Sequence, residues 1–342
     1  MSTEAEYYHA LAVSMGGEYH TLAKLFAQHK SWRRSYETKI GKRTTPRPLA
    51  DSLAQSGIYL LLADDPEFPT LLREIPWPPH ALYYRGTLPK QQLIVAVVGT
   101  RKATPGGLLI AEQFAQSLSS RGLGIASGLA FGIDVAAHKA TLKAGGYAIA
   151  VLAGGLDGIT PRTNAMVGEE IIKRGGCLLS EYPPGVAPMP RRFIERNRIV
   201  SGLSQGILVI EAPKRSGTLS TARFATEQNR DVFVVPGGIT QINYVGSNEL
   251  IKNGAQLVTT PEDIVEALGI ATPVAHAQPL PFLDSVEQRI VDIVSAAGHA
   301  LTVDAIAEQS QLGATVINEA LALLVIEGVL TEGPAGYQRT TF

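Results

Sequence analysis

The sequence predicts an α/β protein built on an extended Rossmann-like, doubly wound parallel sheet, with a small helical N-terminal region and a C-terminal winged-helix domain. The first observation is that short apolar runs alternate with helical runs between residues 93 and 268. This alternation is typical of parallel strands joined by helices that cover both faces of a sheet. The second is that the strand 207–211 leads into a glycine-hydroxyl helix start, Ser216-Gly-Thr218. Free N–H groups at such a start bind anions beside the carboxyl ends of parallel strands.

The composition is that of an ordinary globular protein. The chain has 342 residues, of which 45% are hydrophobic and 18% charged, and its formal net charge is −1. No run reaches the roughly 18 apolar residues of a membrane span, and the N-terminus has no secretory signal. We therefore expect a cytoplasmic protein without a membrane partner. The single cysteine, Cys177, excludes an intramolecular disulfide and a thiolate metal cage, and its strand-like setting predicts inert packing.

Changes in pattern divide the chain into four segments. These are a helical N-terminal region (1–55), the extended Rossmann-like domain (56–270), a linker (271–284) and a winged-helix domain (285–342). Between Lys24 and Arg47 there are eight Lys and Arg but one Glu, so this run is either a solvated face or an auxiliary nucleic-acid surface. Residues 56–90 are rich in proline and predict extended chain that packs against the domain after it.

The C-terminal segment predicts three helices and a hairpin, which is the order of a winged helix. The predicted helices are 286–296, 303–309 and 316–327, and the hairpin is 329–340. Residues 285–342 carry two Arg against seven Asp and Glu. An acidic surface does not neutralise DNA phosphates. The pattern therefore favours a protein-interaction or regulatory module, and the alternative is a DNA-reading winged helix with the Rossmann-like domain as a sensor.

Basic residues gather where strands of the large domain end. Residues 191–230 contain eight Lys and Arg against three Asp and Glu, which indicates a polyanionic ligand. Four helix starts are expected to face one groove at this edge, and a linear chain of phosphates would contact several of them at once. The candidate phosphate-binding residues are Arg101, Lys102, Arg162, Asn164, Arg196, Asn197, Arg198, Lys214, Ser216, Gly217, Thr218, Gly237, Gly238, Ser247 and Asn248.

Arg196 and Arg198 are expected to differ in role, because they lie about 200° apart on a helix. One is expected to pair inward with a carboxylate such as Glu181 or Glu211, while the other faces the ligand. Periodicity does not choose between them. Aromatic side chains that could stack on bases are Phe131, Tyr182 and Tyr244.

Other site classes lack their signatures. The loop 99–107 does not have the G-x-G-x-x-G spacing, the second strand supplies no acidic residue for a ribose, and residues 214–218 do not form a P-loop. Asp134 and His138 lie one turn apart on a helix, but a metal site would need a third ligand and only Asp157 is an obvious candidate. We therefore predict no cofactor, no metal, no catalytic residues and no enzymatic activity.

An ordered set of motifs resembles the DNA-processing protein A family, also called Smf. The motifs are Val98-Gly-Thr-Arg101, Ser127-Gly-Leu-Ala-x-Gly-Ile-Asp134, Ala150-Val-Leu-Ala-Gly-Gly-Leu-Asp157, Leu179-Ser-Glu181, Arg196-Asn-Arg-Ile199, Glu211-Ala212, Ser216-Gly-Thr218, Val235-Pro-Gly237 and Gly246-Ser-Asn-x-Leu-Ile251. The resemblance implies that residues 56–270 bind single-stranded DNA without sequence preference, protect incoming DNA, form a homodimer and load the RecA recombinase in natural transformation and recombination. By position, Arg101, Arg162 and the turn 214–218 would contact the DNA.

A phosphoribohydrolase on the same fold is the alternative. Nucleoside-monophosphate phosphoribohydrolases of the lysine-decarboxylase-like group resemble this fold and use a Pro-Gly-Gly-x-Gly-Thr-x-x-Glu signature. In this chain Gly217-Thr218 places Thr221 at the acidic position. Without a carboxylate there to assist glycosidic cleavage, this alternative is disfavoured.

Overall fold

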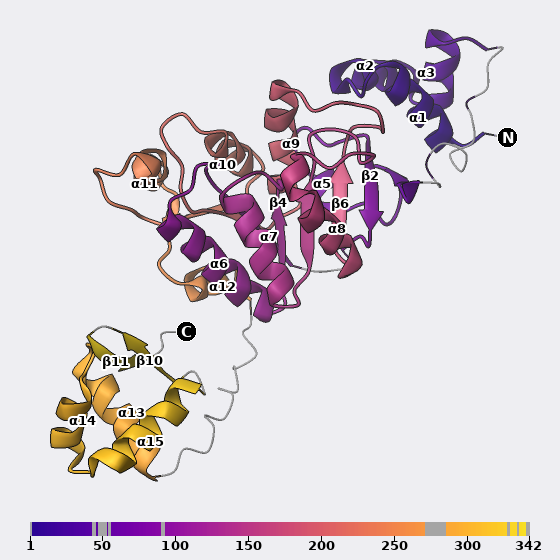
Figure 1. The fold of residues 1–342 in the computed structure, drawn as a ribbon. Helices are drawn as coiled ribbons and strands as arrows, with labels where there is room; N and C mark the ends of the chain where they lie inside the picture. Colours follow the sequence, from indigo (N-terminus) through magenta and orange to yellow (C-terminus); the bar gives the residue numbers. More distant parts are fainter. Residues whose placement is uncertain are drawn as a thin grey trace. The chain divides into compact units, whose positions relative to one another are not determined.

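The computed structural model describes residues 2–42, 46, 53, 56–89, 93–270, 285–326, 329–333 and 335–339. The chain forms two compact units, residues 1–271 and 272–342 (Figure 1). The predicted linker 271–284 lies outside the described residues. In the described part of the chain, no helix has the length and apolar character needed to cross a membrane.

The first unit is built on one sheet that, over the described residues, has nine strands. In spatial order they are β1 (Tyr59–Leu62), β2 (Ala81–Gly86), β6 (Cys177–Ser180), β5 (Ala148–Val151), β4 (Gly124–Ser127), β3 (Ile94–Val98), β7 (Gly206–Val209), β8 (Asp231–Val234) and β9 (Gln256–Leu257). The strands from β6 to β9 are parallel, as predicted.

One edge of this sheet differs from the prediction of a purely parallel sheet. β2 pairs antiparallel with β6, and β1 pairs antiparallel with β2, with Tyr59 opposite Tyr84 and Leu62 opposite Ala81. Both strands come from the proline-rich segment that was expected only to be extended. Five of the prolines fall in the connection between the strands, around the short helix α5 (Thr70–Arg73), and Pro89 follows β2, so all of them leave the strand hydrogen bonds intact.

Helices cover both faces of the sheet, as a doubly wound fold requires (Figure 1). Alternate residues of β3 show this. Val95 and Val97 pack in a cluster with α6 (Pro105–Ser120), α7 (Ile133–Lys143) and α12 (Pro261–Ala267). Ala96 and Val98 pack in another cluster with α5, α9 (Pro190–Gly202) and α10 (Thr218–Glu227). The remaining helices of this region are α8 (Ala165–Lys173) and α11 (Val245–Lys252).

Three N-terminal helices pack on the β1–β2 end of the same unit. They are α1 (Glu4–Ser14), α2 (Tyr19–His29) and α3 (Trp32–Lys39). Thr3 and Glu6 form a capping box that starts α1, and the Glu4 carboxylate accepts hydrogen bonds from the start of α3. Buried Tyr8, Leu11 and Trp32 share a cluster with residues of the sheet. The N-terminal helices therefore share a core with the large domain.

The second unit contains the elements predicted for residues 285–342. They are α13 (Ser285–Ala297), α14 (Val303–Ser310), α15 (Ala314–Ile326), β10 (Leu330–Gly333) and β11 (Gly336–Arg339). The hairpin β10–β11 is joined by Leu301, which pairs with Tyr337 ahead of α14. Ile290, Ile306 and Leu321 are fully or almost fully buried in its own core. The order of elements agrees with the expected one, and the winged-helix assignment stays a prediction.

Candidate anion-binding site at the topological switch point

A cavity of about 480 Å³ lies at the carboxyl ends of β3, β4 and β7. β3 lies between β4 and β7. From β4 the sheet continues through β5 and β6 toward one edge, and from β7 it continues through β8 and β9 toward the other edge. This reversal is the switch point at which open α/β sheets bind ligands. The lining residues are Val98, Gly99, Thr100, Arg101, Gly128, Ala130, Asp134, Pro190, Phe193, Ile194, Arg196, Asn197, Val200, Pro213, Arg215, Ser216, Gly217, Thr218 and Thr221.

Three guanidinium groups line this cavity, on three different segments. Arg101 follows β3, Arg196 lies in α9, and Arg215 precedes α10; Arg101 and Arg215 are exposed, whereas Arg196 is only 4% exposed. The Arg101 guanidinium carbon lies 4.9 Å from the centre of the Phe193 ring, a distance at which cation–π attraction holds the side chain. The cavity therefore has positive charge both at its exposed part, from Arg101 and Arg215, and at its buried part, from Arg196.

Arg196 is held by backbone oxygens at the ends of two strands. Its Nη1 donates to the carbonyl oxygens of Gly128, at 2.8 Å, and of Val151. Within the described protein, Nη2 has no hydrogen-bond partner. Burial lowers the pKa of Arg196 to about 10; nearby Asp134 opposes this shift and Arg101 adds to it. The group remains charged at neutral pH, with donor capacity left for an anion.

Gly128 makes room for this guanidinium. A Cβ at residue 128 would lie 2.4 Å from Nη2 of Arg196 and 2.5 Å from its central carbon. Any side chain there would displace Arg196 from its two carbonyl acceptors. Gly132 is equally constrained, because its φ is +72° and a Cβ would meet the Thr100 oxygen at 2.3 Å.

Asp134 fixes the loop that carries Gly128. Its Oδ2 accepts hydrogen bonds from the N–H groups of Gly128, at 3.1 Å, and Ala130, at 3.4 Å. Burial raises the pKa of Asp134, and Arg196 acts in the opposite direction. His138, one turn later, is fully buried, and burial lowers its pKa to about 3. Asp134 therefore has a structural role in this loop. Among the described residues there is no cluster of three metal-ligating side chains.

The start of α10 supplies the backbone side of the cavity. The Ser216 hydroxyl accepts from the N–H of Thr218 at 3.2 Å. The N-cap residue of α10 is Gly217, which has no side chain to cap the helix. Asn197 of α9 ties the two helices together, since its Nδ2 donates to the Gly217 oxygen at 3.2 Å and to Ser220 Oγ at 3.0 Å. The N–H groups of Thr218, Leu219 and Ser220 donate within this turn, so the start of α10 contributes to the cavity the partial positive charge of a helix N-terminus.

The structure brings six of the fifteen predicted residues into this cavity and leaves nine outside it. Those lining it are Arg101, Arg196, Asn197, Ser216, Gly217 and Thr218. Those outside are Lys102, Arg162, Asn164, Arg198, Lys214, Gly237, Gly238, Ser247 and Asn248. Of the second group, Lys102, Arg162, Lys214 and Gly238 are exposed.

Arg198 was a candidate phosphate-binding residue, but the structure buries it. Its side chain is 0% exposed, and its Nη2 lies 2.5 Å from Oε1 of the buried Glu181. It also donates to the carbonyl oxygens of Trp77 and Glu195, at 2.9 and 3.0 Å. Arg198 is therefore the inward-pairing member of the two arginines, with Glu181 as its partner.

The other carboxylate considered for pairing, Glu211, has a different task. Its carboxylate accepts from the N–H and hydroxyl of Thr104, at 3.0 and 2.5 Å, and from Asn243 at 2.8 Å. A Cβ on Gly107 would meet this carboxylate at 2.5 Å. Glu211 therefore fixes the start of α6 beside the cavity.

Three further candidates make hydrogen bonds within the protein: Asn164, Ser247 and Asn248. Asn164 donates to the Leu129 oxygen at 3.0 Å. Helix α11 begins at Val245, so Ser247 and Asn248 fall in its first turn. Ser247 is fully buried and accepts from the N–H of Ala212 at 2.9 Å, and Asn248 exchanges two hydrogen bonds with the Gly237 backbone.

Thirteen of the nineteen lining residues were not among the fifteen candidates. Arg215 is one of them, although it lies in the turn 214–218 for which the family resemblance implies DNA contact. Phe193 and Pro213 add apolar lining that no motif marks. Among the expected stacking aromatics, Tyr182 and Tyr244 are buried at 2% and 6% exposure, and Phe131 is 46% exposed. Only Phe131 of these three is available for stacking on a base.

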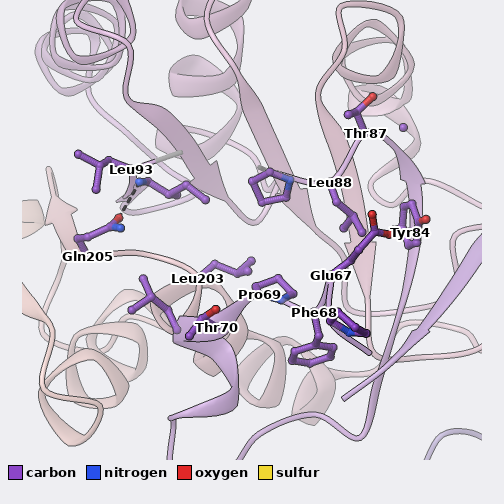
Figure 2. Close-up of a pocket in the computed structure, with 15 residues that line it drawn as sticks. Glu67, Phe68, Pro69, Thr70, Tyr84, Thr87, Leu88, Leu93, Leu203 and Gln205 are labelled. Atoms are coloured by element: carbon purple, nitrogen blue, oxygen red, sulfur yellow. Dashed lines mark hydrogen bonds between the residues drawn. The ribbon is translucent and has the colours of Figure 1, made fainter. Parts of the chain in front are cut away.

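A second, larger cavity of about 1070 Å³ lies at the opposite end of the sheet strands. Figure 2 shows Leu88, Leu93 and Leu203 around it, together with Phe68 and Tyr84. Glu67 is the one charged side chain among its described lining residues. The described lining of this cavity therefore offers no cation for a phosphate.

Together the fold and the switch-point cavity define a Rossmann-like α/β protein with a cationic cavity at the carboxyl ends of its strands. Residues 59–269 match the family described as DNA recombination-mediator protein A. The chain is 39% identical to Protein Smf of Escherichia coli K12 over 84% of its own length and 79% of that protein's length. It therefore belongs to this family, as the sequence motifs predicted.

Solved structures agree with this assignment. DNA processing protein A from Streptococcus pneumoniae has a TM-score of 0.60 at 37% identity, covering 69% of this chain and 80% of that one. The protein from Helicobacter pylori, described with a unique single-stranded DNA binding mode, has a TM-score of 0.55 at 30% identity, covering 62% of this chain and 95% of that one.

Proposed function

We propose that this protein binds single-stranded DNA without sequence preference, through the switch-point cavity and the exposed cations near it. The observation that carries the proposal is Arg196, a buried guanidinium with an unpartnered Nη2 that lines one cavity with Arg101, Arg215 and the start of α10. Each of these groups recognises phosphate oxygens, which every DNA sequence presents. The family relationship and the DNA binding described for the Helicobacter pylori protein support the proposal.

The test is the fluorescence anisotropy of a labelled oligothymidine, titrated with protein at several salt concentrations. Affinity should fall steeply with salt, because phosphate contacts release counterions. Arg101→Ala should weaken binding and lower the salt slope by about 0.7, the value for one single-strand phosphate contact. Arg223→Ala is the matched control, because Arg223 lies on α10, is 66% exposed at its side chain and does not line the cavity. Absence of binding even at low salt would contradict the proposal.

Self-association and RecA loading in the cytoplasm are the finer parts of the proposal, and they rest on the family relationship. A homodimer through the Rossmann-like domain should give twice the chain mass in light scattering at micromolar concentration. Loading should appear as faster RecA assembly on DNA that is covered by a single-strand binding protein. A monomer at all concentrations would contradict the first, and an unchanged assembly rate the second.

The acidic C-terminal unit is proposed to contact protein rather than DNA. Residues 285–342 carry seven acidic side chains against two arginines, so their field repels a phosphate backbone. Removing residues 272–342, which form a separate compact unit, should leave oligothymidine affinity within about twofold. Abolished binding would instead favour the alternative in which this unit reads DNA.

A further inference from the structure

The charge of the switch-point cavity exceeds what one internal DNA phosphate needs. Its described lining carries three guanidinium groups and one carboxylate, Asp134, so its net charge is +2. The start of α10 adds a partial positive charge of about 0.5. An internal phosphodiester carries one negative charge, whereas a terminal phosphomonoester carries about −1.5 to −2 at pH 7. The cavity matches the monoester.

The single carboxylate, Asp134, offsets part of the charge of Arg196, and the net charge of +2 already includes it. Asp134 is buried and is already engaged by the N–H groups of Gly128 and Ala130. Arg101 and Arg196 lie close enough to repel, since Arg101 contributes to the lowered pKa of Arg196. A dianion between them would offset this repulsion more completely than a monoanion.

The form of the cavity also suits a strand end. Cations line it from the exposed Arg101 and Arg215 to Arg196, which is buried. Phe193, Val200 and Pro213 add apolar lining for a sugar and base. A volume of about 480 Å³ falls within the roughly 300–1,000 Å³ of small-molecule sites.

We propose that this cavity binds the terminal phosphate of a DNA strand, a phosphomonoester, in preference to internal phosphodiester groups. The inference rests on the proposed function, because it assigns one phosphate of a bound strand to this cavity. Internal phosphates then contact the exposed cations outside it, among them Lys102 and Lys214.

The experiment compares three short oligothymidines of equal length: one with a 5′-phosphate, one with a 3′-phosphate and one with neither. Each competes against a labelled oligothymidine for the full-length protein. We expect at least one phosphorylated end to bind about tenfold more tightly than the unphosphorylated strand, which corresponds to about 1.4 kcal/mol. The end that is preferred also reports the strand polarity. Equal affinities within twofold would overturn the inference.

Two charge-removing variants localise the effect. Arg215→Gln lowers the net charge of the cavity to +1 and should abolish most of the preference for a phosphorylated end. Arg223→Gln removes a charge from the same segment outside the cavity and should retain the preference. Both arginines are exposed, so both variants should fold, which circular dichroism checks. A tenfold preference retained by Arg215→Gln would overturn the assignment to this cavity.

The outcomes separate this inference from the function beneath it. If all three oligothymidines bind equally well, single-stranded DNA binding stands and the terminal-phosphate site falls. If none binds at low salt, both fall. A tenfold preference that depends on Arg215 supports both.

Discussion

Replacing Glu181 by Gln tests the buried ion pair that anchors α9. The Glu181 and Arg198 side chains are 4% and 0% exposed, and Oε1 lies 2.5 Å from Nη2. The amide keeps the shape of the carboxylate and removes its charge, which leaves the guanidinium uncompensated in a low-dielectric interior. Breaking a buried pair costs about 3–5 kcal/mol. Because the amide oxygen can still accept one hydrogen bond, we expect the lower end, about 3 kcal/mol.

Tryptophan fluorescence during urea unfolding measures this change where it occurs. The chain has two Trp; Trp77 lies 4.5 Å from the Arg198 guanidinium carbon, and Trp32 packs against His80 in the same aromatic cluster. With a denaturant slope of about 3 kcal/mol/M, the midpoint should fall by about 1 M.

The exposed pair of Arg85 and Glu169, at 3.0 Å, supplies the control. Glu169→Gln should cost less than about 1 kcal/mol, because the Glu169 side chain is 55% exposed and water screens the pair. The double variant Glu181→Leu with Arg198→Met should recover most of the loss, since paired hydrophobic replacement is often neutral. If Glu181→Gln cost no more than Glu169→Gln, the reasoning about the buried pair would be refuted.

Three further results are expected. Gly128→Ala should weaken oligothymidine binding about tenfold and destabilise the fold by roughly 1–3 kcal/mol, because its Cβ would displace Arg196, whereas Gly158→Ala, whose Cβ meets nothing within 4 Å, should do neither. Burial raises the pKa of the Cys177 thiol, so a thiol reagent should react with no cysteine in the native protein and with one in urea; fast native reaction would contradict this packing. Burial, with Arg198 beside it, lowers the pKa of His80 to about 4, so the unfolded state binds this proton first as the pH falls from 6.5. Stability should decrease from pH 6.5 to about 4 by up to about 1.4 kcal/mol per pH unit from this residue, and urea unfolding of His80→Phe should lack that share.

The parallel part of the sheet could be predicted because its strands are buried on both faces and therefore consist of continuous apolar residues. β3 contains Ile94, Val95, Ala96, Val97 and Val98, all buried. β1 and β2 give a weaker signal, because prolines between them interrupt the pattern and β2 is buried only in its first half. Their place at the sheet edge depends on pairing with β6, which lies about a hundred residues further along the chain.

The candidate site was predictable to the extent that helix starts and strand ends define it. The sequence did not predict which arginine of α9 faces a ligand. That choice depends on contacts of Arg198 with Glu181, Trp77 and Tyr19, which all lie outside α9. Helical periodicity separates the two side chains by angle but contains no information about which direction is solvent. The burial of Ser247 has the same cause, since its partner is the Ala212 backbone of another segment.

The position of α9 has a practical consequence for dividing this protein into fragments. Glu18 pairs with Arg191 of this helix, Gly16 accepts from Arg192, and the Tyr19 ring covers Arg198, while Arg196 and Asn197 line the cavity. A fragment beginning at residue 56 would keep every strand of the sheet, yet it would expose a charged helix face to water. Expression of the first unit in isolation should therefore start at the capping box of α1. If a shorter fragment lost affinity for DNA, this would not show that the N-terminal helices contact DNA.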